Sequence, residues 1–503
     1  MALASIWLQS ARPRSGSRPG KLAAALVLLA ALALLSTLVS HLLYNGYLSQ
    51  DALHSYARLL VMRDASGLRL EYAGFLSPQV ALYLNYLISL LPGLEGAVVP
   101  YLLDIAAVSV LATLLWRDLA RTQGHVWALV WTLLLIAHPF TLWTATAGFS
   151  AGLGLLAFYC LCRTLRHFQG ESQLKGYLRF AGWLCLLFFI DERALFIALA
   201  ILPWMVLVAP SDLLRRAPLA FYLVCFVPFI LALFSWAYLN WVYYGEGLRF
   251  LLDPDSRFRG GLGQAHALPW LSEVGGTWWP ALAWLAMIGL PAFPSILLAP
   301  WGRVPGSWAA TAVSAASVLG AGTIASWLWF ASHPVLFLSL LLVPAAIGLR
   351  ATRPGNRPLV TVALLGGLML AWLMIFRVPV ATLTHWTMAL QHPVDLDPHD
   401  ELELGTWLAQ SRMPTMIDDR AAFAVIAARR DAKDLVLPFS DEFRIALASP
   451  DRLPAQIVIA APGSPQGSQD AINRRFPQIW REGHPGYQLV YEQEVWRVWQ
   501  RQQ

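Results

Sequence analysis

Residues 45–91 read NGYLSQDALHSYARLLVMRDASGLRLEYAGFLSPQVALYLNYLISLL and follow the first long apolar segment of the chain. The stretch begins polar, carries an acid directly after that apolar segment, and turns apolar again in its last third. Residues three and four apart share one side of an α-helix. We therefore expect one polar stripe, made of Asp51, His54, Ser55 and Arg58. Such a helix can lie along a membrane surface with its charges facing a water-filled cleft, so the stretch predicts a candidate active site with Asp51 as its central acid.

The composition is that of a membrane protein with many spans. Of 503 residues, 57% are hydrophobic and only 13% are charged. Apolar runs of about 20 residues recur, which is the length that an α-helix needs to cross the hydrocarbon core. The net charge of +6 lies mainly in short loops between these runs, so it indicates membrane orientation rather than a nucleic-acid partner. All four cysteines lie inside apolar runs, a placement that predicts neither disulfides nor a zinc site.

The apolar runs predict about eleven transmembrane helices. Residues 1–21 are expected to form a disordered cytoplasmic tail, and residues 22–377 a transmembrane domain that starts with a span at 22–44. Ten further spans are predicted at 98–117, 126–146, 149–166, 176–190, 194–209, 218–241, 279–299, 308–330, 334–349 and 359–376. A short apolar segment, 78–91, is interpreted as a re-entrant or interfacial helix.

The loops assigned to the cytoplasm each carry Arg or Lys, as the positive-inside rule requires. Two long outer segments, 45–97 and 242–278, are charged although topology does not demand it, so we expect them to carry function.

Residues 378–503 have the composition of a soluble domain, expected to be α/β and extracytoplasmic. A helix is predicted over 400–410. Short buried strands are predicted at 416–417, 435–437, 457–460 and 488–491. The ending VWRVWQR, residues 495–501, alternates apolar and polar residues and is interpreted as an edge strand.

Asp51 is the strongest catalytic candidate, as a general base that takes the proton of an attacking hydroxyl. The alternative interpretation is a helix N-cap, since Asp is a favoured cap residue. The second outer segment holds Arg249, Arg257 and Arg259, and guanidinium groups bind phosphate oxygens in pairs. Contact with lipid headgroups, or pairing with acids of the same loop, would explain these cations equally well.

A charged turn at 191–193 interrupts one long apolar block and is either a structural hairpin or a second wall of the cleft. Asp104 lies inside a predicted span, where an acid needs a partner or water. Asp64 is a second candidate acid, although a solvated connector role also fits. The spacing of the histidines predicts no metal site. The further cleft candidates are His54, Asp64, Glu192 and His266.

The order of these segments resembles that of the GT-C glycosyltransferases, which include protein mannosyltransferases and lipid A aminoarabinose transferases. NGYLSQDALHSYARLL at 45–60 and YAGFLSPQVALYLNYLISLLPG at 72–93 match their first outer loop, with an acid after the membrane exit and a Pro-containing apolar re-entry. IDERALFIALAILPW at 190–204 resembles a turn that commonly carries a basic residue, Pro and Glu. The Asp-Glu-Arg here has no Pro, which leaves the role of Arg193 open.

The resemblance implies an inverting transfer of a sugar from a polyprenyl-phosphate-linked donor at the outer face of the membrane. The acceptor would be a glycan, a lipid or a protein, and the location a bacterial inner membrane with the C-terminal domain in the periplasm. Asp51 would be the base. The candidate phosphate ligands would be Arg58, Arg193, Arg249, Arg257 and Arg259. The paired-acid motif of metal-dependent oligosaccharyltransferases is absent around Asp51, so a divalent metal stays open but is not indicated.

Two other classes of function remain. A polysaccharide ligase or polymerase would also bind lipid phosphate through arginines. Under this hypothesis Asp51 is expected to be dispensable. A transporter, flippase or assembly subunit would not be an enzyme. Transporters often show repeated halves and acids near the middle of the membrane. No repeat is evident here and the charges gather at one face, which argues against transport.

Overall fold

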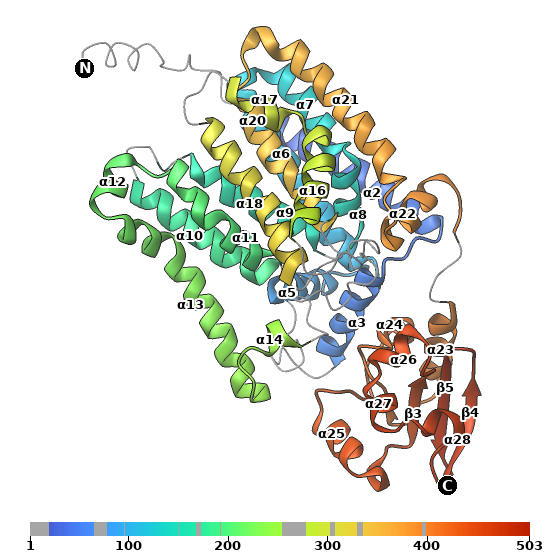
Figure 1. Ribbon diagram of the computed structural model, residues 1–503. Coiled ribbons are helices and arrows are strands. Elements are labelled where there is room, and N and C mark those ends of the chain that lie inside the picture. The colour runs from blue at the N-terminus through green and yellow to red at the C-terminus, as the bar shows by residue number, and fades with distance from the viewer. Residues whose placement is uncertain are drawn as a thin grey trace, which may run out of the picture.

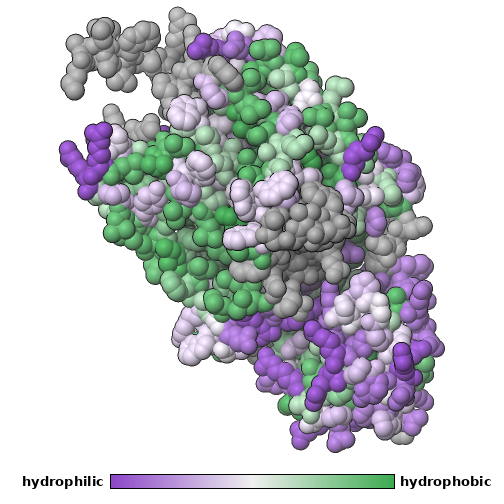
Figure 2. All heavy atoms as spheres, viewed as in Figure 1, coloured by the Kyte–Doolittle hydropathy of each residue, from purple (hydrophilic) through white to green (hydrophobic). Residues whose placement is uncertain are grey.

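A computed structural model describes residues 20–64, 78–94, 96–148, 150–166, 168, 173–191, 193–253, 278–301, 307–328, 335–394 and 399–502. Figure 1 shows a large helical body and, below it, a smaller part that holds the sheet. Apolar residues cover much of the visible surface of the helical body, and polar residues dominate the smaller part (Figure 2). This contrast is expected if the body lies in lipid and the smaller part in water.

The helical body is built from long apolar helices joined by short ones. The longer helices are α2 (Lys21–Tyr44), α6 (Val99–Gln123), α7 (His125–Ile136), α9 (Ala151–Leu165), α10 (Gln173–Ile190), α13 (Pro218–Tyr244), α16 (Trp279–Ala292), α18 (Ser307–Leu328) and α21 (Arg357–Ile375). The shorter helices are α3 (Gln50–Asp64), α5 (Gln79–Ser89), α8 (Pro139–Thr146), α11 (Ala194–Ile201), α12 (Ser211–Arg216), α14 (Arg249–Leu252), α17 (Ser295–Leu298), α19 (Val335–Leu338), α20 (Leu342–Arg350) and α22 (Ala381–Gln391). The 3-10 turns are η1 (Leu202–Leu207), η4 (Ala299–Trp301), η5 (Ser339–Leu341) and η6 (Pro354–Asn356).

In the part of the chain that the structure describes, five helices are long and apolar enough to cross a membrane. They are α2, α6, α13, α18 and the segment that ends with α21. The pair α7 and α8 would make a sixth span, although it is bent by 67° where Pro139, which has no backbone N–H, begins a new helix. The other predicted spans coincide with shorter or less apolar helices, so the count of eleven is not confirmed.

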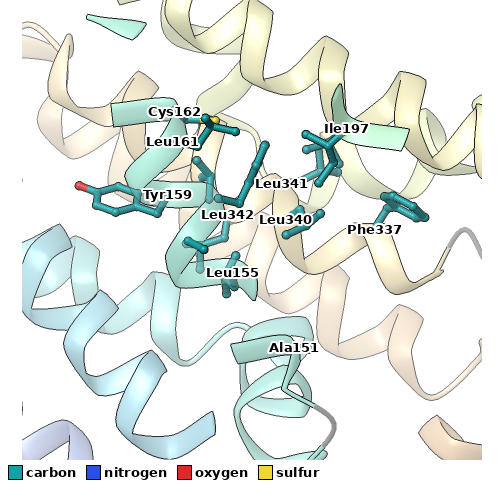
Figure 3. Packing of buried hydrophobic residues seen from close by; sticks show 14 of the residues in the cluster. Ala151, Leu155, Tyr159, Leu161, Cys162, Ile197, Phe337, Leu340, Leu341 and Leu342 are labelled. Atoms are coloured by element: carbon teal, nitrogen blue, oxygen red, sulfur yellow. The ribbon is translucent and has the colours of Figure 1, made fainter. Parts of the chain in front are cut away.

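Helix α6 lies inside the body and packs against α2, α7 and α9. The apolar core continues from α9 to α11 and to the segment that holds η5, where Leu155, Cys162, Ile197 and Leu341 lie close together (Figure 3). In contrast, few side chains of α2 and α21 are buried. These two helices therefore present the surface that a lipid bilayer would cover.

The smaller part contains a five-stranded sheet with the order β2-β1-β3-β5-β4. The strands are β1 (Thr415–Met416), β2 (Leu435–Val436), β3 (Gln456–Ala460), β4 (Tyr487–Glu492) and β5 (Trp496–Arg501). The helices are α23 (His399–Gln410), α24 (Phe423–Arg429), α25 (Asp441–Ala448), α26 (Pro465–Gln469), α27 (Ala471–Arg475) and α28 (Ile479–Glu482), with a 3-10 turn η7 (Pro450–Arg452). Strand β1 pairs in parallel with β2 and β3, and β5 pairs antiparallel with β3 and β4.

The predicted helix at 400–410 and the predicted strands are confirmed. The prediction of an edge strand at 495–501 is wrong, because β5 lies between β3 and β4. Alternating apolar residues tell which face of a strand is buried, and they do not tell whether its two edges are paired. The edges of this sheet are β2 and β4.

Candidate active site between the helical body and the C-terminal part

Contacts on two sides hold the beginning of helix α3 in place. The backbone N–H of Ser49 donates to the hydroxyl of Tyr101 on α6 at 2.9 Å. On the other side, Gly148 has a positive φ of 72°, and a Cβ added there would lie 2.9 Å from the Cβ of Ala52. Only glycine adopts this conformation readily and leaves room for α3. The start of α3 is therefore held against α6 and the turn after α8.

Asp51 lies in the first turn of α3 and is only 3% exposed. Because α3 begins at Gln50, Asp51 is the second helical residue, not the residue before the helix. A carboxylate in the first turn interacts favourably with the helix dipole. The phenols of Tyr47 and Tyr101 both interact with this carboxylate. Burial raises the pKa of Tyr47 well above its usual value, and the neighbouring Tyr101 and Asp51 raise it as well. Nothing in the sequence pattern pointed to these two tyrosines.

Asp104 is fully buried on α6 and faces the beginning of α9. Its carboxyl accepts hydrogen bonds from the backbone N–H groups of Ser150 at 3.1 Å and Gly152 at 3.0 Å. These groups lie at the N-terminus of α9, where backbone donors have no partner within the helix. The N-terminus of α9 thus provides the hydrogen-bond partner that Asp104, an acid inside a predicted span, requires. Arg193 also lies within electrostatic range of Asp104.

The turn at 191–193 is closed by a buried ion pair. The Nε of Arg193 donates to both carboxylate oxygens of Asp191, at 2.9 and 3.1 Å, and both residues are buried. Arg193 also donates to the carbonyl of Leu336. A side chain at Gly154 would overlap the Asp191 carboxylate. The ion pair therefore joins α9, α10 and α19, as the hairpin interpretation predicts, and Glu192 lies outside the described residues.

The far half of α3 faces the C-terminal part. His54 makes an edge contact with the ring of Phe423, with centroids 5.6 Å apart. The guanidinium of Arg58 lies 3.4 Å from the carboxylate of Asp419. His54 and Ser55 are buried, as Asp51 is. Helix α24 packs against α3, and the water-filled cleft expected along this stripe stays a prediction.

Asp64, at the end of α3, is also held in place. Its carboxylate accepts from the backbone N–H of Ala432 at 2.7 Å and from the Nε of Arg63 at 3.2 Å. The solvated connector interpretation is therefore corrected, because Asp64 joins α3 to the segment after α24. A cavity of about 500 Å³ lies along the same junction, with Tyr56, Arg63, Leu402 and Arg430 in its wall.

Helix α14 brings one predicted cation to this end of the body. The Nε of Arg249 lies 3.1 Å from the carboxylate of Asp253, and its guanidinium lies 4.3 Å above the ring of Tyr244. The neighbouring Phe250 packs edge-on against Phe188, close to the turn at 191–193. Arg257, Arg259 and His266 lie outside the described residues.

The described residues contain no group of three or more His, Cys, Asp or Glu side chains that could hold a metal ion. No family model matches the sequence, and no curated protein matches it. A solved structure is similar to almost the whole chain: ArnT from Cupriavidus metallidurans bound to undecaprenyl phosphate, with a TM-score of 0.57 and 13% identity. The match covers 94% of this chain and 97% of that chain. The chain has the GT-C glycosyltransferase fold.

ArnT from the same organism in the apo state is also similar, with a TM-score of 0.45, 12% identity, and coverage of 95% of this chain and 98% of that chain. Because the match to the undecaprenyl phosphate-bound structure covers 94% of this chain, the likeness in fold extends beyond the first third of the chain, where the sequence resemblance lies.

Within this GT-C fold, the predicted site residues separate into three groups. Asp51 lies with Tyr101 and Asp104 at the start of α3. His54, Arg58 and Asp64 face the C-terminal part. Arg193 and Arg249 lie at the same end of the body, each beside a carboxylate.

Proposed function

We propose that the chain is a membrane glycosyltransferase that transfers a sugar from a polyprenyl-phosphate-linked donor to an acceptor at the outer face of the membrane. The observation that carries this proposal is the GT-C fold with a buried carboxylate, Asp51, at the start of α3. Undecaprenyl phosphate is bound to the similar ArnT structure, which supports a polyprenyl carrier. The acceptor would be a glycan, a lipid or a protein.

The chemistry needs one base and one group of cations. A hydroxyl of the acceptor attacks the anomeric carbon from the face opposite the phosphate, so the new C–O bond forms with inversion. Asp51 takes the hydroxyl proton. The bond between the anomeric carbon and the phosphate oxygen breaks, and polyprenyl phosphate leaves with the electron pair. A positioned general base contributes about 10²–10⁴-fold to such a rate.

The leaving phosphate needs guanidinium groups near the membrane surface. Among the described candidates, Arg249 fits best, because its side chain is partly exposed and a guanidinium has five N–H donors. Arg257 and Arg259 belong to the same outer segment and remain candidates. Arg58, Arg193 and Arg249 each already face a carboxylate, but the side chains of Arg58 and Arg193 are less exposed than that of Arg249, at 20% and 5% against 27%. We therefore assign these two arginines a positioning role.

The proposed site lies at the outer face of a multi-pass protein of the bacterial inner membrane, with the N-terminus in the cytoplasm and the C-terminal part in the periplasm. The apolar helices support a membrane location. The arginines and lysines at the opposite ends of the helices support the orientation, because such cations stay in the cytoplasm.

A transfer assay in membranes with labelled polyprenyl-phosphate sugars tests the proposal. Asp51→Asn is expected to lower turnover about 10²–10⁴-fold, because the amide cannot take the proton. The matched control is Asp64→Asn on the same helix, which keeps an oxygen for the Ala432 amide and is expected to preserve turnover.

Undiminished transfer by Asp51→Asn would reject the base assignment and favour the ligase or polymerase. Movement of lipid or solute into proteoliposomes without any transfer would favour a transporter.

A further inference from the structure

One buried carboxylate gathers several arginines at the end of the helical body opposite α3. Asp118 lies on α6, about 21 Å beyond Asp104 by the rise of the helix, and is fully buried. Its Oδ2 atom lies 2.9 Å from Nε of Arg163, 3.2 Å from Nη1 of Arg350 and 3.6 Å from Nη2 of Arg166. Its Oδ1 atom lies 3.9 Å from Nη1 of Arg121. We call these four arginines the Asp118 cluster.

The single carboxylate cannot satisfy the cations that surround it. The hydroxyl of Tyr159 also donates to Oδ2, at 2.8 Å, and a carboxylate oxygen offers only about two lone pairs. Arg121 is too far from Asp118 for a hydrogen bond. The Nε of Arg166 is buried and has no partner among the described residues. Among the residues that the structure describes, the cluster sets four positive charges against one negative charge.

The positive-inside rule explains why cations occur in these loops, but it does not explain why they converge. The arginines come from α6, from the end of α9 and from the end of α20. Like charges brought this close repel one another, and an anion held between them would offset that repulsion. The four side chains are between 17% and 43% exposed, so an anion can reach them from the surface.

The surroundings favour a lipid over a free ion. Helix α10 packs against α9, and its first turns carry Leu174 and Leu178, which are 61% and 54% exposed. A phospholipid could place its phosphate against Arg166 and Arg163 and lay its acyl chains on these leucines. Guanidinium groups match phosphate geometry in pairs. We propose that the Asp118 cluster binds the phosphate of an anionic phospholipid in the leaflet opposite the proposed active site.

The test uses the purified full chain in a neutral detergent and follows thermal unfolding by tryptophan fluorescence. Phosphatidylglycerol is expected to raise the unfolding midpoint, whereas phosphatidylcholine and inorganic phosphate at the same concentration leave it unchanged. The double variant Arg121→Gln, Arg166→Gln is expected to bind phosphatidylglycerol at least about tenfold more weakly, because a hydrogen bond to a charged group is worth about that factor. The matched control is Arg216→Gln, an exposed cation on α12, which is expected to keep the response.

Equal stabilisation by phosphatidylcholine, or an equal loss of binding in Arg216→Gln, would overturn the proposal. Equal stabilisation by inorganic phosphate would show that the site takes the free ion and would reject the lipid.

If the double variant does not fold, native mass spectrometry of the wild type decides. Retention of phosphatidylglycerol over phosphatidylcholine supports the site, and retention of neither rejects it. These measurements do not use transfer activity, so they stand or fall independently of the proposed function.

Discussion

Asp104 lies near the candidate base Asp51, and replacing it tests whether its role is structural or catalytic. The Asp104 carboxyl accepts two backbone N–H groups at the beginning of α9, that of Gly152 buried and that of Ser150 partly buried. Each buried donor left without a partner costs about 1–3 kcal/mol, so Asp104→Ala is expected to destabilise the protein by about 2–6 kcal/mol. That is a large share of the roughly 5–15 kcal/mol that holds a typical protein folded.

The Asp104→Asn variant keeps one oxygen acceptor and is expected to lose about half as much, about 1–3 kcal/mol. The assay is thermal unfolding in detergent, for which the 23 tryptophans give a strong signal. The expected order of unfolding temperatures is wild type, then Asp104→Asn, then Asp104→Ala. Ser109→Ala is the control, because Ser109 is buried on the same helix and its hydroxyl has no partner among the described residues.

Wild-type stability of Asp104→Ala would refute this reasoning. If that variant also lost transfer activity, Asp104 would belong to the chemistry rather than to the end of α9.

Three further predictions concern the structure around the site. Gly154→Ala is expected to push the Asp191 carboxylate aside and to cost about 3–5 kcal/mol by breaking a buried ion pair, measured by thermal unfolding. Burial and, after it, repulsion by a neighbouring Asp carboxylate raise the pKa of Asp418 to about 6 and that of Asp470 to about 7. Both pKa values lie above that of an Asp in the unfolded chain. The two carboxyl groups therefore contribute fully to stability below about pH 4, and this contribution is lost as the pH rises through 6 and 7. The unfolding temperature is expected to be higher at pH 5 than at pH 8. Asp64→Ala is expected to speed proteolysis of the C-terminal part, because it leaves a partly buried amide of that part without its acceptor.

Each of these predictions has a control variant. Gly182→Ala on α10 has open space around the added Cβ and is expected to be neutral or slightly stabilising. The double variant Asp418→Asn, Asp470→Asn is expected to flatten the pH dependence. An unchanged slope would assign the titration to other groups. Asp64→Asn, which keeps an acceptor oxygen, is expected to resist proteolysis as the wild type does.

The helices and strands were largely readable from the sequence, because their apolar runs and alternations have the correct lengths and periods. The helix at 399–410 and strand β3 are examples. The bend between α7 and α8 was less visible, because the two helices together have the length and hydropathy of one span although His138 and Pro139 lie where they meet. The position of β5 in the sheet depends on which strands pair with it, and a local pattern contains no such information.

The site was predictable in its residue types and less so in its contacts. Asp51 was singled out by its position after a membrane exit. Its tyrosine neighbours come from the turn before α3 and from α6, and no spacing rule connects them. Arg58 was expected to face phosphate, yet it faces Asp419, which is distant in the sequence. Long-range ion pairs of this kind, including those of Asp118, depend on the tertiary fold.

Helix α3 shares its apolar side with the C-terminal part, since Leu53, Tyr56 and Leu60 form one buried cluster with Val425 and Trp496. Its first turn belongs to the helical body, where Ala52 packs. A chimaera that exchanges only the residues after 378 with those of a relative would therefore mismatch the apolar side of this helix, while its first turn stays packed in the helical body. Recombination or design must therefore match the side of α3 that carries Leu53, Tyr56 and Leu60 to the new C-terminal part.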